Sequence, residues 1–370
     1  MAILYIVHKM KIVHIAEFEH TKDNGIKGVV LTLQCEQEKL GSSVYIFNIS
    51  SQNQKVVKKD ELSVCSTSCF KHNINALQPD VVIFHSVYKP IYISFSRFLR
   101  KKNILYLIEP HGGTSTDNAK KSYLKKRIAN LLLFNHFFAK AKGVIYLNEY
   151  EREKCVFKDI RKAAFVIPNG IYPPSGDIST AHKPKNKIHF TFLARIDIHH
   201  KGIDILLDAI SILSKTADKD DYIFNFYGSS SNKKDIIYLK NRLKTIGNNL
   251  FYHGSVWGEQ KEQALTNTNI YVLTSRNEGM PLSVLEALSC GCPCVITPQT
   301  NMQNIIENNH SGWVVQSDSK AIAEVLSRAI KEYRQKQDVY THNAIMSVQY
   351  FTWDFIAKKA VCEYSKALNK

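Results

Sequence analysis

Two glutamates and a glycine-containing turn occur together between Thr274 and Gly291, in the segment TSRNEGMPLSVLEALSCG. The segment follows an apolar run typical of a strand, and Pro281 suits the first turn of a helix. Backbone N–H groups at such a helix start, together with the positive end of the helix dipole, form a site for a diphosphate. Glu278 and Glu286 can accept hydrogen bonds from sugar hydroxyls. This combination favours a nucleotide sugar as ligand; spacing alone would instead favour a capping residue and part of a solvated helix face for the two glutamates.

Two cations follow the first predicted strand of the second half of the chain. Arg195 closes the run FLAR at the end of that strand, and Lys201-Gly202 opens the next helix six residues later. Two fixed cations at the carboxyl end of a strand could neutralise the phosphates of a leaving nucleotide. An isolated Arg and Lys on a loop are usually solvated surface charges. Beside the segment 274–291, however, they complete a diphosphate site.

The elements that would position these residues alternate along the whole chain. Short runs rich in β-branched and aromatic residues are separated by helical patterns, as in parallel α/β units. We therefore predict an α/β protein with two doubly wound, Rossmann-like domains facing a cleft, with ligands bound beyond the carboxyl ends of the strands. The predicted strands are 12–16, 44–49, 81–84, 104–108, 144–147 and 165–167, followed by 188–193, 223–227, 270–273, 294–297 and 313–315.

A polar stretch after Pro168-Asn169-Gly170 marks the predicted linker. It divides an N-terminal, acceptor-side domain (1–175) from a C-terminal, nucleotide-sugar-binding domain (176–345). In the remaining residues, 346–370, small and apolar side chains recur at helical spacing behind Trp353. We expect this last segment to form a helix that packs back towards the N-terminal domain.

Taken together, these residues resemble glycosyltransferase family 4, a group of GT-B-fold enzymes that are mostly retaining and metal-independent. Glu278 and Glu286 match the E-x7-E motif of that family, and Arg195 and Lys201-Gly202 match its phosphate-binding Arg and Lys-Gly. The resemblance covers nearly the whole chain. It extends to Pro168-Asn169-Gly170 at the end of the first domain and to Phe351-Thr352-Trp353 before the last helix.

The resemblance implies a role for each matching residue. The catalytic set would be His111, Arg195, Lys201 and Glu278: His111 and Glu278 would lie near the donor sugar, whereas Arg195 and Lys201 would bind the diphosphate. Glu286 would hold the ribose. Gly25 and Gly28, placed in the loop after the first strand, resemble a Gly-rich turn that faces phosphate or acceptor. The complete predicted donor-binding set is Gly25, Gly28, Gly279, Met280, Pro281, Leu282, Ser283 and Glu286.

The implied chemistry is transfer of a sugar from a UDP- or GDP-linked donor to a glycan or lipid-linked acceptor in surface polysaccharide synthesis. Retention without a glycosyl-enzyme intermediate is expected, because no residue is an obvious covalent nucleophile. Neither a metal nor a separate cofactor is expected. Two departures from the family pattern affect sugar and acceptor contacts: the segment 300–304, and Asp23-Asn24 with Lys27 in the first loop.

The composition is strongly basic. Forty-nine Lys plus Arg against 33 Asp plus Glu give a net charge of +16, which predicts attraction to an anionic partner. The stretch Lys120–Lys142 mixes basic and aromatic residues, as in a helix on an anionic membrane surface, or equally in a helix with its aromatic face in the core. Without a spanning run or signal peptide, and with only eight cysteines, we expect a cytoplasmic protein, peripheral on the inner face of the plasma membrane.

Two other functions are open to this sequence. A nucleotide-sugar epimerase would share the fold, but the Pro-Asn-Gly turn, the Arg195/Lys201 pair and the E-x7-E spacing weigh against it. A basic nucleic-acid-binding protein would explain the charge. That function lacks a recognisable RNA- or DNA-binding signature, so we expect no nucleic-acid partner.

Overall fold

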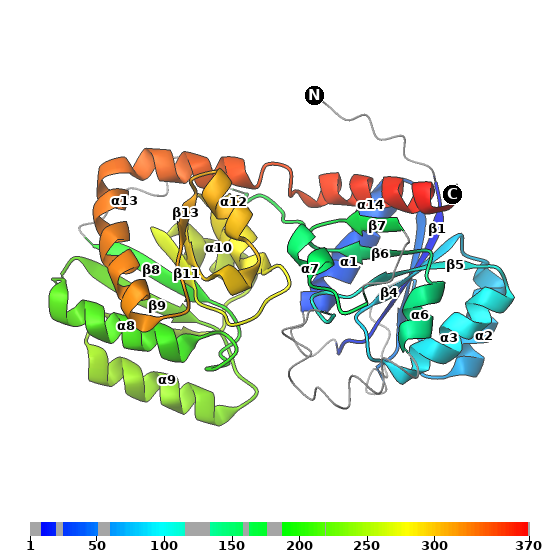
Figure 1. The fold of residues 1–370 in the computed structure, drawn as a ribbon, viewed down its shortest axis with the longest axis horizontal. Coiled ribbons are helices and arrows are strands. Elements are labelled where there is room, and N and C mark those ends of the chain that lie inside the picture. The colour runs from blue at the N-terminus through cyan, green and yellow to red at the C-terminus, as the bar shows by residue number, and fades with distance from the viewer. Residues whose placement is uncertain are drawn as a thin grey trace. The chain divides into compact units, whose positions relative to one another are not determined.

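The computed structural model describes residues 9–19, 25–50, 60–114, 134–157, 163–175, 187–218 and 220–368. The chain forms two compact units, shown in Figure 1. Unit 1 comprises Met1–Gly170 together with Trp353–Lys370, and unit 2 comprises Ile171–Thr352. The chain therefore passes between units at Gly170 and again at Trp353, rather than at the predicted positions 175 and 345.

The described part of unit 1 is a parallel sheet of seven strands in the order β3-β2-β1-β4-β5-β6-β7. Its central strands are almost wholly apolar and buried, as expected when helices cover both faces of a parallel sheet. The strands are β1 (Lys11–Ala16), β2 (Ser43–Asn48), β3 (Glu61–Ser63), β4 (Val81–His85), β5 (Leu105–Glu109), β6 (Gly143–Tyr146) and β7 (Ala163–Val166). The helices are α1 (Gly25–Lys39), α2 (Thr67–Leu77), α3 (Pro90–Lys101), α6 (Asn135–Lys140), α7 (Glu149–Glu153) and α14 (Trp353–Leu368).

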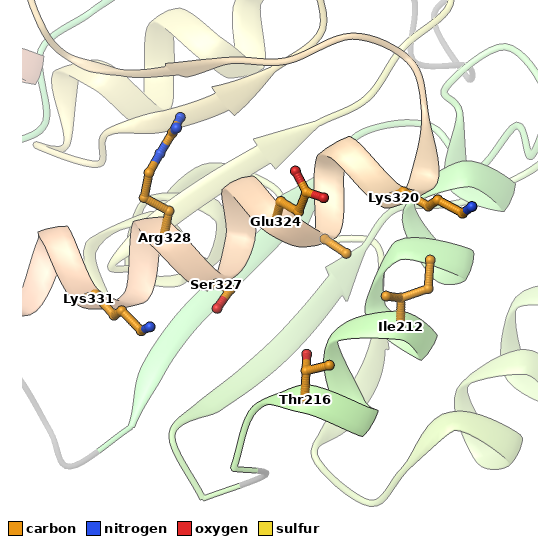
Figure 2. A pocket seen from close by; sticks show the side chains of 8 residues that line it. Ile212, Thr216, Lys320, Glu324, Ser327, Arg328 and Lys331 are labelled. Atoms are coloured by element: carbon orange, nitrogen blue, oxygen red, sulfur yellow. The ribbon is translucent and has the colours of Figure 1, made fainter.

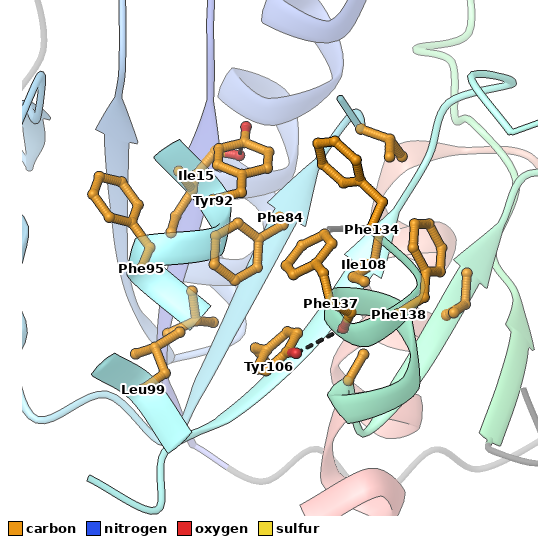
Figure 3. Close-up of a cluster of buried hydrophobic side chains, with 14 of the residues drawn as sticks. Ile15, Phe84, Tyr92, Phe95, Leu99, Tyr106, Ile108, Phe134, Phe137 and Phe138 are labelled. Carbon is orange, nitrogen blue, oxygen red and sulfur yellow. Dashed lines mark hydrogen bonds between the residues drawn. The ribbon is translucent and has the colours of Figure 1, made fainter. Parts of the chain in front are cut away.

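Aromatic side chains fill the core of unit 1 between the sheet, α3 and α6, as Figure 3 shows. The ring of Phe84 packs edge-on against that of Phe137, with centroids 5.2 Å apart, and the Tyr106 hydroxyl donates to the Phe137 carbonyl at 2.7 Å. Phe137 and Phe138 are each 1% exposed. The prediction that they face a membrane is therefore wrong: they belong to the core, which is the alternative the sequence left open. Residues 120–133 of that basic segment lie outside the described part.

The last helix belongs to unit 1. α14 packs along α1 and buries Trp353, Ile356, Ala360 and Tyr364, which confirms the predicted amphipathic pattern. Gly170, the last residue before the chain leaves unit 1, lies against the Trp353 ring so closely that a Cβ would come within 2.6 Å of it. A glycine is therefore required where the departing chain meets the returning helix.

The described part of unit 2 is a parallel sheet of six strands in the order β10-β9-β8-β11-β12-β13. The strands are β8 (Ile188–Leu193), β9 (Tyr222–Tyr227), β10 (Leu250–Gly254), β11 (Ile270–Leu273), β12 (Cys294–Ile296) and β13 (Gly312–Val314). The helices are α8 (Ile203–Thr216), α9 (Lys233–Ile246), α10 (Gly258–Thr266), α11 (Leu282–Ser289), α12 (Gln303–Asn308) and α13 (Ser319–Ser347), with a short 3-10 turn at Pro298–Thr300.

The sequence missed β3 and β10. β3 is only three residues long, and β10 is an edge strand in which Phe251 and His253 are exposed, so neither forms a continuous apolar run. Among the described residues, no helix is both long enough and apolar enough to cross a membrane.

Candidate donor site and a buried histidine chain

The carboxyl ends of β8 and β11, which are neighbours in the sheet, bring two loops of unit 2 together. Gly202, at the end of the loop after β8, has a left-handed φ of 63°, and a Cβ there would overlap the carbonyl oxygen of Thr274. The Thr274 hydroxyl donates to the Gly202 carbonyl at 3.0 Å. Only glycine allows this approach, which explains physically why glycine follows Lys201.

Lys201 and Glu278 form an ion pair across these loops. The ammonium of Lys201 contacts Oε1 of Glu278, and the two side chains are 13% and 12% exposed. The same carboxylate oxygen accepts a hydrogen bond from the Ser275 hydroxyl at 2.7 Å. A residue predicted to bind the diphosphate and a residue predicted to bind the sugar therefore belong to one charged site.

Arg195 lies on the loop after β8 with 61% of its side chain exposed. Its Nη2 is 3.3 Å from Oδ2 of Asp197, whose other oxygen accepts the His200 N–H at 3.0 Å. The Asp197 carbonyl accepts the N–H of Lys201 at 3.0 Å. Both predicted phosphate-binding cations have a negatively charged partner, because each contacts a carboxylate. The exposed pair of Arg195 contributes little stability, so the guanidinium can turn towards a ligand at small cost.

Glu286 projects from α11 and contacts a residue that the sequence did not single out. Its Oε1 is 2.6 Å from Nζ of Lys261 on α10, and the two side chains are about one quarter to one third exposed. α11 begins at Leu282, with Pro281 as the preceding cap residue, so Pro281 stands one position earlier than predicted. The side chain of Met280 is buried, so only its backbone can face a ligand.

Tyr271 of β11 links the separate parts of this site. Its hydroxyl lies 2.8 Å from the Ser283 hydroxyl on α11 and 2.8 Å from the Leu193 carbonyl at the end of β8. Burial raises the pKa of Tyr271 well above its ordinary value, and the nearby Cys294, Glu286 and Glu278 raise it further. The Tyr271 hydroxyl therefore joins the end of β8 to the first turn of α11.

Two further contacts hold the loops, and sequence reasoning missed both. Arg276 makes a bidentate pair with Asp204 on α8, with both N–O distances 2.8 Å, and donates to the His199 carbonyl at 2.6 Å. Asn301, at a left-handed φ of 60°, donates its side-chain amide to the Glu278 carbonyl at 2.6 Å. The segment 300–304, noted as a departure from the family pattern, thus supplies a support for Glu278.

At the carboxyl edge of the unit 1 sheet, three histidines form a buried chain. His14 on β1 contacts Oε1 of Gln37 on α1 through Nε2 (2.9 Å) and Nε2 of His85 through Nδ1 (2.8 Å). His85, the last residue of β4, contacts Nε2 of His111 through Nδ1 at 2.9 Å. The sequence singled out His111 alone; the positions of His14 and His85 on adjacent parallel strands were the available signal.

Glu109, the last residue of β5, lies beside this chain. Its carboxyl oxygens are 3.4 Å from His85 Nδ1 and 3.6 Å from His111 Nε2. Burial, followed by the charge of Glu151, raises the pKa of Glu109 to about 8. Burial lowers the pKa of His111 to about 4; it is also the main cause of a lowered pKa of about 4 at His14 and of the strongly lowered pKa of His85. The histidines are therefore neutral near pH 7.

The side chains of His85, Glu109 and His111 offer three ligand-type atoms within 4.8 Å of one another, a geometry that could hold a metal ion. The sequence did not indicate this cluster. The absence of a metal requirement remains a prediction.

Gly25 and Gly28 do not form the predicted loop. They lie in the first turns of α1, and apart from chain neighbours and the backbone of the helix itself, no atom of the described residues lies within 4 Å of a Cβ built at either position. Neither glycine is therefore required by a close approach of neighbouring protein atoms.

Two surface pockets lie away from these residues. One, of about 650 Å³, runs between α8 and α13 and is lined by Ile212, Thr216, Lys320, Glu324, Ser327, Arg328 and Lys331 (Figure 2). The other, of about 260 Å³, includes Arg100, Tyr106, Lys140 and Lys142 of unit 1. Neither contains a residue of the predicted donor site.

Comparison with known proteins gives a family match over the region that contains the candidate donor site. The model of a family described as "Glycosyl transferases group 1" matches residues 177–345. The protein is a glycosyltransferase. The matched region holds Arg195, Lys201, Glu278 and Glu286, and the two parallel sheets with their helices have the GT-B fold.

This glycosyltransferase is 24% identical over 352 residues to an uncharacterized 41.2 kDa protein in the cps region of Klebsiella pneumoniae, covering 89% of this chain and 93% of that protein. It is 26% identical over 192 residues to the UDP-Gal:alpha-D-GlcNAc-diphosphoundecaprenol alpha-1,3-galactosyltransferase of Escherichia coli, covering 47% of each chain. In fold it is similar to a glycosyltransferase from Rickettsia africae ESF-5, with a TM-score of 0.79, 16% identity, and 98% of this chain and 99% of that chain covered.

Proposed function

We propose that the protein is a retaining, metal-independent glycosyltransferase of family 4. It transfers a sugar from a UDP- or GDP-linked donor to a glycan or lipid-linked acceptor in surface polysaccharide synthesis. The Lys201–Glu278 pair carries this proposal, because it joins a phosphate-binding cation to a sugar-binding carboxylate beside the start of α11. The name of the E. coli relative supports a UDP-linked donor and a lipid-linked acceptor, and the cps-region relative supports capsule synthesis.

Loss of a nucleoside diphosphate leaves negative charge on phosphate, and two cations can stabilise it. The ammonium of Lys201 lies at the carboxyl edge of the sheet, and the exposed Arg195 can turn from Asp197 towards a phosphate. The dipole of α11 adds positive potential at its first turn, where the amides of Leu282 and Ser283 begin the helix. Because these groups supply the charge that a diphosphate needs, the proposed mechanism uses no metal and no cofactor other than the donor.

The contacts of Glu278 suit a residue that binds the sugar. Its carboxylate is fixed by Lys201 and Ser275, and its backbone by Gln299 and Asn301. When the ammonium of Lys201 pairs with the donor phosphate, the carboxylate of Glu278 can accept hydrogen bonds from sugar hydroxyls. Retention then follows from attack of the acceptor on the face that the diphosphate leaves, without a covalent intermediate.

The deciding experiment incubates the protein with a panel of UDP- and GDP-sugars and a polyprenyl-diphosphate-linked sugar acceptor. We expect one donor to raise the melting temperature and to be consumed, with the anomeric configuration of the new bond matching that of the donor by NMR. An inverted product would refute retention, and conversion of the donor sugar without an acceptor would indicate an epimerase.

We further propose peripheral association with the inner face of the plasma membrane. Residues 97–142 contain eleven Lys plus Arg against two acidic residues, and Arg100, Lys140 and Lys142 line one pocket. Clustered cations attract anionic lipid surfaces at low salt. Sedimentation with anionic but not with neutral vesicles is expected, and equal recovery with both would contradict it.

A further inference from the structure

We propose that His14 and His85 are positioning residues that fix which nitrogen of His111 carries the proton, and thereby the polarity that its ring offers to a ligand. This inference rests on the prediction, made from the sequence, that His111 contacts a ligand. It goes further by naming two buried residues, on β1 and β4, that act through His111 without touching the substrate.

The order of contacts determines each proton. Gln37 turns its carbonyl oxygen Oε1, which can only accept, towards His14, and its buried Nε2 has no hydrogen-bond partner among the described residues; in this orientation His14 donates from Nε2. A neutral ring has one donor, so Nδ1 of His14 accepts from Nε2 of His85. Nδ1 of His85 then accepts from Nε2 of His111. The remaining nitrogen of His111, Nδ1, then has a lone pair that can accept a hydrogen bond from a hydroxyl of a ligand.

The surroundings hold the chain in this arrangement. His14 and His85 are wholly buried, so water cannot substitute for either partner. His111 sits at a left-handed φ of 52°, unusual for a residue with a side chain. Gly112 after it has a φ of 77° and donates its N–H to Oε1 of the buried Glu151 at 2.5 Å. Backbone strain of this kind persists where the surrounding structure enforces it.

A hydrogen-bonded chain fits the distances better than a metal site does. Two nitrogens bound to one tetrahedral zinc, each at about 2.0–2.1 Å, lie about 3.3 Å apart. His85 Nδ1 and His111 Nε2 are 2.9 Å apart, the distance of an N–H···N hydrogen bond. Metal binding at His85, Glu109 and His111 is therefore an outcome to be tested against the proposal.

The direct test is ¹⁵N NMR of the full chain labelled at histidine, with His111 assigned by comparison with H111N. We expect a single neutral tautomer of His111, protonated at Nε2, near pH 7. A mixture of tautomers, or protonation at Nδ1, would overturn the proposal. Addition of Co²⁺ followed by visible absorption provides the second arm: stoichiometric binding that is lost in the His85 and His111 variants would identify a metal site instead.

A matched pair of His85 variants separates the effect of the hydrogen bond to His111 from the effect of a changed side-chain volume. Asn places a polar atom near the position of Nδ1, so H85N can still accept from His111, whereas Gln reaches the position of Nε2, so H85Q keeps only the contact to His14. We expect kcat/KM for the donor to be at least about tenfold lower in H85Q than in H85N, which is about 1.4 kcal/mol, at similar thermal stability. Equal losses in the two variants would refute positioning.

The NMR measurement keeps this inference separate from the proposed function. If H111N turned over donor normally, His111 would have no role with the sugar, while a single tautomer in the wild type would still show that the chain orders the ring. If no nucleotide sugar is a substrate, the tautomer measurement remains decisive.

Discussion

The two sheets of this protein place polar groups at the same position, the carboxyl edge, but stabilise them in opposite ways. In unit 2, Lys201 and Glu278 are charged and balance each other in a partly exposed site. In unit 1, His14 and His85 are wholly buried, His111 is partly buried, and hydrogen bonds and ring contacts between neutral side chains order them. A charged site can exchange one partner for a ligand phosphate, whereas a neutral chain can only change the positions of its protons. The first arrangement suits binding of a charged leaving group, and the second suits orientation of a hydroxyl.

The largest effect is expected at Lys201. K201A should lower turnover by about 10²-fold or more, because it removes a charge aimed at the leaving diphosphate. It also leaves Glu278, only 12% exposed, without its cation. Steady-state kinetics measures the turnover, and circular dichroism checks that the variant folds. The matched control is K261M, which removes the cation that pairs with the second glutamate of the motif, Glu286. Near-normal turnover in K201A would remove the proposed role of the charged site.

Arg195 tests whether an exposed cation acts in the same site. R195A should also reduce turnover, by about 10²-fold, if the guanidinium stabilises phosphate charge in the transition state. Its stability should change little, because its side chain is 61% exposed and its pair with Asp197 is long. D197N is the control, since it removes the same pair but keeps the cation. Loss of turnover in D197N alone would contradict the assignment.

Alanine substitutions at two glycines compare a position that contacts a neighbouring backbone carbonyl with a position that has open space around it. G202A should destabilise unit 2 by more than about 1 kcal/mol, because it forces a side chain to a positive φ and into the Thr274 carbonyl. G28A should be neutral or stabilising by about 0.4–1 kcal/mol, since its Cβ meets open space in α1. Urea unfolding compares them. Loss of transferase activity in a stable G28A would restore the predicted ligand role of Gly28.

The buried carboxyl of Glu109 predicts a pH dependence of stability. Its pKa is raised from 4.5 to about 8, so between these values the native state holds a proton that the unfolded state releases, and stability falls as pH rises. The histidines, with lowered pKa values, oppose this trend up to about their ordinary pKa of 6.5. The fall should therefore be clearest between pH 6.5 and 8, at up to about 1.4 kcal/mol per pH unit.

Urea unfolding of wild type and E109Q at pH 6.5 and pH 8 measures this slope. E109Q should show less of it, because Gln cannot ionise. Glu151, whose pKa is also raised by burial, leaves a residual slope in both proteins. Equal slopes in E109Q and wild type would show that Glu109 does not carry the effect.

The smallest effect concerns Lys261. K261M should change the free energy of unfolding by only about 0.2–1 kcal/mol, because its pair with Glu286 is partly exposed. If Glu286 holds the ribose, loss of its cationic neighbour should change KM for the donor more than kcat. A change confined to kcat would place Lys261 with the diphosphate instead.

Much of the fold could be predicted from local patterns. The strands 188–193 and 270–273 were predicted at their observed limits, because runs rich in β-branched and aromatic residues between polar loops identify strands. Gly25 and Gly28 were misplaced because two glycines near the end of a strand suggest a turn, although a helix can tolerate them. β10 escaped detection because its exposed residues alternate with buried ones at the edge of the sheet.

The candidate site was predictable only where a motif is local. Glu278 and Glu286 lie in one segment, so their spacing was visible, whereas the Arg276–Asp204 pair joins residues 72 positions apart. His14 and His85 were missed for a similar reason. Each is a lone histidine in an apolar strand, and only the parallel pairing of β1 with β4 brings them together.

The place of α14 in unit 1 has a consequence for how the chain is made. A ribosome releases the strands of unit 1 first, then all of unit 2, and only then residues 353–368. The side of α1 that α14 covers therefore stays uncovered while the second half is synthesised, so unit 2 can complete its core before unit 1 does. The first domain to emerge is thus the last to be finished.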